Sequence, residues 1–152
     1  ILVASDFSDQ ADCAVAYGAQ MARHYRGRVA ILHVLDTEME GIEPSYAAAI
    51  IQKRQRRMPG AFDHQLRGLK DVEFACVTGN PSLEIVRFAQ DCGADLVLMA
   101  HHTREPDPEK AFLGSTVVKV SQNAPCPTMS INRAFDMRCG MMYDQSGDVA
   151  RA

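Results

Sequence analysis

Residues 29–35 have the sequence VAILHVL, an almost continuous apolar run. A strand with one wet face alternates polar and apolar side chains, whereas a strand of a parallel sheet that helices cover on both faces is apolar throughout. We therefore predict that residues 29–35 form a buried strand of a parallel sheet. His33 is its one polar member, and we expect a hydrogen-bonded core histidine there rather than a ligand.

On the amino-terminal side of this run, residues 1–4 (ILVA) predict another strand. The polar sequence SDFS at residues 5–8 can cap a helix, and small and apolar residues recur at helical spacing from Asp9 onward. Gly27 ends this pattern, and we expect it to take the left-handed conformation that closes many helices. The segment therefore predicts a strand followed by a helix with a small-residue face.

On the carboxyl-terminal side, strands and helices continue to alternate. Apolar runs predict strands at residues 72–78, 96–100 and 127–131. Helices are expected to start near Pro44, at Pro81 after the N-cap Asn80, and near Gly114-Ser115.

Two details of these helices can be predicted. Proline removes a backbone donor and clashes with the preceding turn, so we expect a kink or break at Met58-Pro59-Gly60. The helix that starts at Pro81 is expected to bury the apolar residues Leu83, Ile85, Val86 and Ala89.

The alternation of five strands with helices determines the fold class. Parallel strands separated by helices require crossover connections, which are right-handed in nearly all proteins. We therefore predict an α/β domain at residues 1–131, built on an open, doubly wound, five-stranded parallel sheet with helices on both faces. Ligands of such sheets bind at the carboxyl ends of the strands. Residues 132–152 depart from the pattern and are expected to form a C-terminal appendage.

Composition and charge narrow the function classes. The 152 residues are 47% hydrophobic and 23% charged, as is typical of one soluble globular domain. The net charge of −3 gives no general attraction for phosphate backbones. We interpret the basic cluster of Lys53, Arg54, Arg56 and Arg57 as the solvated face of a helix, and we predict no binding of nucleic acid.

Cysteine usage and the length of the apolar runs predict the compartment. The five cysteines are an odd number without a C-x-x-C pair, and we recognise no signal peptide, so a reducing cytoplasm fits best. The apolar runs are too short to cross the ~30 Å hydrocarbon core of a bilayer, and we predict no membrane segment.

Several segments, in their order and spacing, resemble the universal stress protein family: ILVASDFS at 1–8, LHVL at 32–35, GNP at 79–81, GADLVLM at 93–99, LGST at 113–116 and NAPCP at 123–127. The resemblance extends over residues 1–131. It implies a fold like that of the adenine nucleotide alpha hydrolases, with strand order 3-2-1-4-5. It also implies a stress-response protein without a catalytic reaction, a homodimer paired through the last strand, and in many members bound ATP.

The ATP site of the family follows a glycine pattern that this chain keeps in part. Members that bind ATP have a glycine after the fourth strand, a second one three positions later, and a Gly-Ser or Gly-Thr pair that opens the next helix. Ala100 and Thr103 occupy the two glycine positions here, whereas Gly114 and Ser115 match the pair. Glycines let backbone amides approach phosphate oxygens, and a helix start offers free N–H groups. We therefore expect a partly degenerate phosphate site.

The loop that joins these positions carries charges of both signs. Glu105, Asp107 and Glu109 would repel a triphosphate unless they point away, whereas phosphate charge can be offset by His101, His102, Arg104 and Lys110.

The adenosine end of the site matches the family better. Asp6 matches an aspartate near the base and ribose, and Val34 matches a position whose backbone contacts the adenine edge. The resemblance thus implies that ATP, ADP or AMP binds at Ala4, Asp6, Val34, Ala100, Thr103, Gly114, Ser115 and Thr116.

Other interpretations of these residues stay open. Asp6 can serve only as a helix cap, and Gly114-Ser115 only as a plain helix start. A second hypothesis for the function is an interaction module of the same family that has lost nucleotide binding and acts through its dimer surface and residues 132–152.

Metal, thiol and hydrolase chemistry have weaker support. His101-His102 has no further ligand at metal-binding spacing, and Cys126, between two prolines, is expected to be a packed residue rather than a nucleophile. A Ser-His-Asp hydrolase would need G-x-S-x-G after a strand, and that motif is missing. A pyrophosphatase or an FMN-binding protein would need a glycine-rich loop after the first strand, where residues 5–9 contain no glycine.

Overall fold

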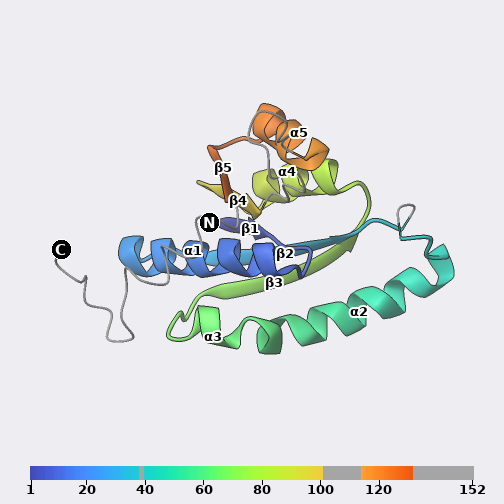
Figure 1. Ribbon diagram of the computed structural model, residues 1–152, viewed down its shortest axis with the longest axis horizontal. Helices are drawn as coiled ribbons and strands as arrows, with labels where there is room; N and C mark the ends of the chain where they lie inside the picture. Colours follow the sequence, from blue (N-terminus) through green and yellow to red (C-terminus); the bar gives the residue numbers. More distant parts are fainter. Residues whose placement is uncertain (38–39, 101–113, 132–152) are drawn as a thin grey trace, which may run out of the picture.

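The computed structural model describes residues 1–37, 40–100 and 114–131, in which helices separate all five strands (Figure 1). The strands are β1 (Leu2–Ala4), β2 (Val29–Leu35), β3 (Val72–Thr78), β4 (Val97–Ala100) and β5 (Thr128–Ile131). The helices are α1 (Asp9–Tyr25), α2 (Pro44–Ala61), α3 (Asp63–Leu66), α4 (Pro81–Asp91) and α5 (Ser115–Asn123). The appendage expected at residues 132–152 lies outside the described residues.

The five strands form one parallel sheet in the order β3-β2-β1-β4-β5. This topology confirms the predicted doubly wound fold and its strand order. β1 lies in the middle, where Val3 is opposite Ile31 of β2 and Leu98 of β4. β3 and β5 are the two edges of the sheet.

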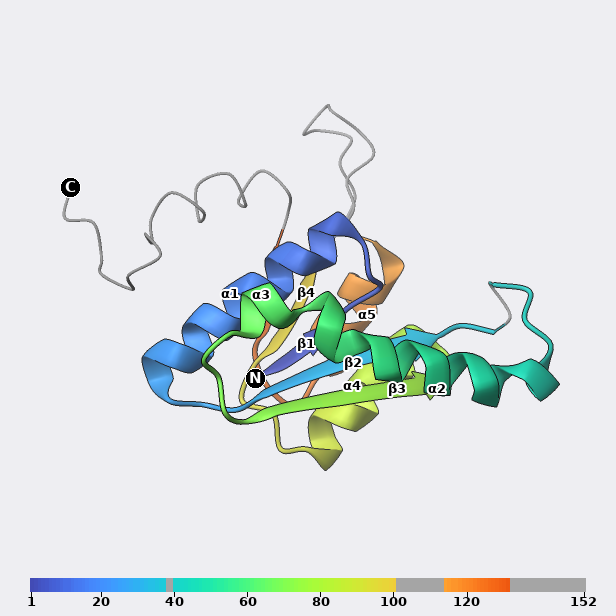
Figure 2. The same cartoon turned by 90° about the horizontal axis from the view of Figure 1, so that it is seen from below.

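Helices cover both faces of the sheet, as the apolar run at residues 29–35 predicts (Figures 1 and 2). Successive side chains of a strand point to opposite faces. Val3 and Ile31 pack in the core beneath α1, α2 and α3, whereas Leu2 and Leu32 pack in the core beneath α4 and α5. All four are fully buried. Burial on both faces is the reason why these strands show no polar alternation.

α1 lies close to the sheet because its inner face consists of small residues. The buried residues of the helix are Ala11, Ala14, Val15, Gly18, Ala19 and Ala22. A Cβ atom at Gly18 would lie 2.7 Å from Cγ2 of Val3 and 3.0 Å from Cδ1 of Leu98. The predicted small-residue face is therefore confirmed, and Gly18 marks the point of closest approach.

The structure corrects the expected end of α1. Arg26, with φ of 54°, is the left-handed residue that closes the helix, rather than Gly27. The N–H groups of both residues donate to the carbonyl of Ala22, so the closing turn forms one residue earlier than the glycine indicates.

Two further helix predictions are wrong in part. α2 does not break at Pro59 but continues to Ala61, because the buried side chains of Met58 and Phe62 anchor its last turn, where the N–H of Phe62 donates to the carbonyl of Met58. In α4, Leu83 is 68% exposed instead of buried. The helical period points Ser82, Ile85 and Ala89 inward and turns Leu83 to solvent.

Candidate functional site

A cleft forms at the carboxyl ends of the strands because β1 is shorter than β2. Ala4, the last residue of β1, pairs with Leu32, and β2 continues beyond this pair. The carbonyl of Leu32 accepts from Ser5 on the β1 side, whereas the carbonyl of Leu35 accepts from Gly79 on the β3 side. Peptide groups alternate between the two sides of a strand, so the N–H and C=O of Val34 point past the end of β1 into the cleft.

The turn after β1 is held by its own side chains. The N–H of Phe7 donates to Oγ of Ser5 at 3.1 Å, and the N–H of Ser8 donates to Oδ1 of Asp6 at 3.0 Å. Ser8 is the N-cap of α1, because its Oγ accepts from the N–H of Ala11 at 3.1 Å. Asp6 is therefore not the cap of α1, and its carboxylate lies at the cleft instead.

A pocket of about 360 Å³ lies between this turn and the start of α5, and we call it the inner pocket. Its lining includes Ala4, Asp6, Val34, Ala100, Gly114, Ser115 and Thr116. The fold thus brings together all of the predicted site residues except Thr103, which lies outside the described residues. The volume of the inner pocket falls within the range typical of small-molecule sites.

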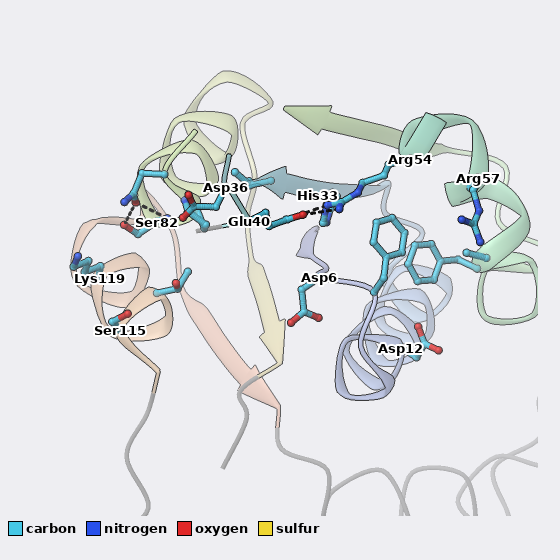
Figure 3. A pocket seen from close by; sticks show the side chains of 17 residues that line it. Asp6, Asp12, His33, Asp36, Glu40, Arg54, Arg57, Ser82, Ser115 and Lys119 are labelled. Carbon is cyan, nitrogen blue, oxygen red and sulfur yellow. Dashed lines mark hydrogen bonds and ion pairs between the residues drawn. The ribbon is translucent and has the colours of Figure 1, made fainter. Parts of the chain in front are cut away.

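A larger cavity of about 1000 Å³ shares Asp6 and Val34 with the inner pocket and extends from there toward α2. In Figure 3, Ser115 and Lys119 of α5 lie at one end, Arg57 of α2 lies at the other end, and Asp6 lies between them. We call the end that Phe7, Asp12, Arg57 and Phe62 border the α2 compartment. The family resemblance predicts the inner pocket but not this extension.

His33 is a buried, hydrogen-bonded histidine, as predicted, and only 4% of its surface is exposed. Its Nδ1 lies 2.8 Å from the carbonyl oxygen of Ser5, and its Nε2 lies 2.7 Å from Nη1 of Arg54. The same guanidinium forms an ion pair of 2.6 Å with Glu40. Burial lowers the pKa of His33, and the Arg54 charge lowers it further, against the opposing effect of the hydrogen bond to Ser5.

The start of α5 offers a cation and, among the described residues, backbone N–H groups without a side-chain cap. Gly114 is the N-cap, with φ of −58° and no side-chain cap, and Ser115 and Thr116 follow it at the cavity wall. Lys119 lines the same cavity one turn later. Lys119 is not among the predicted phosphate-binding charges, which all lie within residues 101–110. Lys119 follows Thr116 by three residues and Ser115 by four. This spacing was the available signal, because residues so spaced share a helix face.

The basic cluster of α2 is only in part a solvated face, which corrects the prediction. Lys53, Arg56 and Arg57 are exposed, as predicted, although Arg57 also lines the cavity. Arg54 instead turns inward to His33 and Glu40. The helical period explains this division, because neighbouring residues of a helix point about 100° apart.

Among the described residues, no group of three or more His, Cys, Asp or Glu side chains could hold a metal ion; His101 and His102 lie outside them. Cys126 packs against the core beneath α4 and α5, and burial raises the pKa of its thiol. This environment agrees with the expected packed residue. None of the helices described above is long and apolar enough to cross a membrane.

A family model described as the universal stress protein family matches residues 1–132. The chain belongs to this family. The match includes all five strands and the elements that border the cleft. This universal stress protein has no match among the curated protein sequences.

Solved structures share the fold of this universal stress protein. The hypothetical protein MJ0577, the subject of a structure-based assignment of biochemical function, has a TM-score of 0.70 and 26% identity over 87% of this chain and 94% of its own. A universal stress protein from Archaeoglobus fulgidus in complex with dAMP has a TM-score of 0.62 and 19% identity, over 86% and 94%. A universal stress protein in complex with cAMP has a TM-score of 0.58 and 21% identity, over 86% and 94%.

Proposed function

We propose that this universal stress protein binds an adenine nucleotide in the inner pocket and acts in the stress response as a nucleotide-dependent binding protein rather than as an enzyme. The observation that carries the proposal is the convergence of residues from four separate segments on one pocket: Ala4 and Asp6, Val34, Ala100, and Gly114 to Thr116. The sequence resemblance names the same residues as the nucleotide site.

Asp6 and Val34 fit the adenosine end of the ligand. The peptide group of Val34 points into the cleft beyond the end of β1, where a donor and an acceptor can meet the edge of an adenine base. Asp6 lies at the same cleft with its turn fixed by the hydrogen bond from Ser8, so its carboxylate is positioned before a ligand binds.

Gly114 to Thr116 fit the phosphate end. Gly114 has an ordinary φ of −58°, and a Cβ atom there would meet nothing within 4 Å. The fold among the described residues therefore does not require glycine, and a serine or aspartate would cap α5 better. A glycine at this place is useful when a ligand approaches the backbone, and the N–H groups of the first turn favour an anion.

AMP and ADP are as suitable as ATP for this site. Ala100 and Thr103 replace two glycines of the family pattern, so the part of the site that would hold the outer phosphates is reduced. Two solved structures of the same fold are complexes with dAMP and with cAMP, and each of these ligands has a single phosphate. This supports the proposal of a monophosphate ligand.

Release and binding of nucleotide test the proposal together. The purified protein is denatured and its supernatant is analysed for nucleotides, and the native protein is heated with millimolar AMP, ADP, ATP or GMP. We expect adenine nucleotides to raise the melting temperature and GMP to have a smaller effect, because the edge of guanine presents different donors and acceptors. If no nucleotide is released and no adenine nucleotide shifts the melting temperature, the proposal is wrong.

Pairing of two chains through β5 is a second part of the proposal. β5 is an edge of the sheet, and its Met129 is 36% exposed. An uncovered edge strand promotes open-ended pairing, so it is usually covered. Sedimentation of the full chain and of a chain that ends at residue 131 tests this. A dimer that persists without the tail and is lost in Met129→Lys supports pairing through β5, whereas a monomer in the full chain contradicts it.

An interaction module without a nucleotide is the second candidate function, and Ala100 in the inner pocket is the observation that favours it. In that case, deletion of residues 132–152 changes partner capture, while nucleotides change nothing. Unaltered capture by the shortened chain counts against this candidate.

A further inference from the structure

The cleft is larger than the site of one nucleotide. The inner pocket has a volume of about 360 Å³, and the cavity that extends it has a volume of about 1000 Å³. The two share Asp6, Val34, Pro81, Ser115 and Thr116, so they are continuous. The α2 compartment begins where these shared residues end, and the proposed nucleotide site does not use it.

The α2 compartment presents an aromatic ring on strained backbone. Phe7 has φ of 63°, a left-handed conformation that is uncommon for a bulky residue, and its N–H is held by Oγ of Ser5 at 3.1 Å. Its ring lies 4.6 Å from the ring of His33 and stacks on Phe62 at 5.9 Å with an interplanar angle of 7°. Phe7 is nevertheless 36% exposed and lines the cavity. Two ring contacts therefore fix an aromatic surface that one more planar ring can reach.

The charges in this compartment favour a neutral ring over an anion. Arg54 is neutralised by Glu40 at 2.6 Å. Among the described residues that line this end, the remaining charged groups are the carboxylate of Asp12 on α1 and the exposed guanidinium of Arg57 on α2, which have opposite signs (Figure 3). An isolated phosphate would meet Asp12 as well as Arg57, whereas the edge of a nucleobase has both donors and acceptors for such a pair.

We propose that the α2 compartment binds a second nucleobase, stacked on Phe7, beside the nucleotide in the inner pocket. The inference rests on the proposed function, because it assigns the second half of the same cleft. The base belongs either to a dinucleotide that spans both compartments or to a second nucleotide molecule. In both cases Phe7 supplies the stacking surface and Arg57 a donor at the rim.

Titration calorimetry with matched compounds separates the two sources of the base. The probes are AMP, adenosine tetraphosphate, and two adenosines joined 5′ to 5′ by two to five phosphates. The compounds with four phosphates differ only by the second adenosine. A dinucleotide that binds at least about fivefold more tightly than adenosine tetraphosphate supports a single spanning ligand, since stacking of a base on an aromatic side chain is worth about 1–3 kcal/mol. Two equivalents of AMP per chain support separate ligands.

Variants assign the effect to the α2 compartment. Phe7→Leu keeps an apolar side chain but removes the ring, and Tyr25→Leu removes an exposed ring at the far end of α1 as its control. We expect Phe7→Leu to remove the dinucleotide advantage or the second equivalent of AMP, and to leave the first equivalent within about twofold, well below the loss of a stacked base. Arg57→Gln should weaken the binding of the second base, whereas Arg56→Gln on the outer face should leave it unchanged.

The outcomes for the two proposals are distinct. One equivalent of AMP, no advantage of any dinucleotide and no effect of Phe7→Leu overturn the second-base inference and leave the proposed function intact. No binding of AMP, of adenosine tetraphosphate or of any dinucleotide contradicts the proposed function and this inference together.

Discussion

Nη1 of Arg54 lies 2.7 Å from Nε2 of His33, in the lining of the larger cavity. A guanidinium is protonated at all relevant pH values and only donates, so Nε2 of His33 must accept. Nδ1 therefore carries the proton and donates to the carbonyl of Ser5 at 2.8 Å. The neutral imidazole thus links α2 to Ser5, in the turn after β1 that also holds Asp6 and Phe7.

This arrangement predicts how stability depends on pH. The pKa of His33 is lowered, first by burial, so the unfolded chain binds a proton more readily than the native protein. Stability is then complete above the unfolded pKa of about 6.5 and decreases as the pH falls through it toward the folded pKa. Chemical denaturation between pH 7.5 and pH 5 should show this loss. His33→Gln should show a flatter dependence, and an equal slope in both proteins would contradict the assignment.

Gly18 predicts a reversal of the usual helix preference. Gly18→Ala adds a methyl group 2.7 Å from Val3, so the gain of about 1 kcal/mol that alanine brings in a helix is exceeded by overpacking of about 1–3 kcal/mol. We expect a lower melting temperature. Gly60→Ala in α2 meets nothing within 4 Å, and it should leave the melting temperature unchanged or raise it. A stabilised Gly18→Ala would show that α1 does not pack as closely as described.

Gly114 separates the role of the helix start from the role of the ligand. A side chain has room there among the described residues, so Gly114→Val should fold normally but block the approach of phosphate. Loss of one backbone hydrogen bond to a charged group corresponds to roughly a tenfold or larger loss of AMP affinity. Gly27→Val, at a similarly open glycine just before β2 and thus at the opposite ends of the strands, serves as the control. Unchanged affinity in Gly114→Val would argue against the site.

Lys119 predicts a dependence on phosphate charge. Removal of the exposed Lys119 charge at the cavity wall should weaken the binding of ATP by about two- to fivefold, the effect of an exposed ion pair. The binding of adenosine should not change. Lys119→Gln is therefore titrated with ATP and with adenosine, alongside Lys53→Gln on the outer face of α2. A loss of the same size for adenosine would indicate that Lys119 acts on the fold rather than on phosphate.

The sequence patterns predict those parts of the fold that depend on local and repeated signals. The apolar run of β2, the Asn80-Pro81 start of α4 and the Gly114-Ser115 start of α5 all appear as expected. Tertiary packing overrules local signals where the predictions are wrong. Pro59 is retained in a helix because Met58 and Phe62 are buried, and Arg26 closes α1 although a glycine follows it.

The candidate site likewise has one part that could be predicted from the sequence and one part that could not. Its inner pocket could be predicted because the motifs that form it lie at strand ends and helix starts, which this topology brings to one edge of the sheet. The α2 compartment could not, since it depends on the left-handed backbone of Phe7 and on the direction in which Arg54 and Arg57 point. Neither feature has a sequence pattern of its own.

A crystal structure of the full chain grown with saturating AMP tests the central claim most directly. We predict electron density for the adenine between Asp6 and the peptide group of Val34, with the phosphate at the N–H groups of Ser115 and Thr116. AMP bound at another place, or a cleft without ligand density at that concentration, would contradict the account.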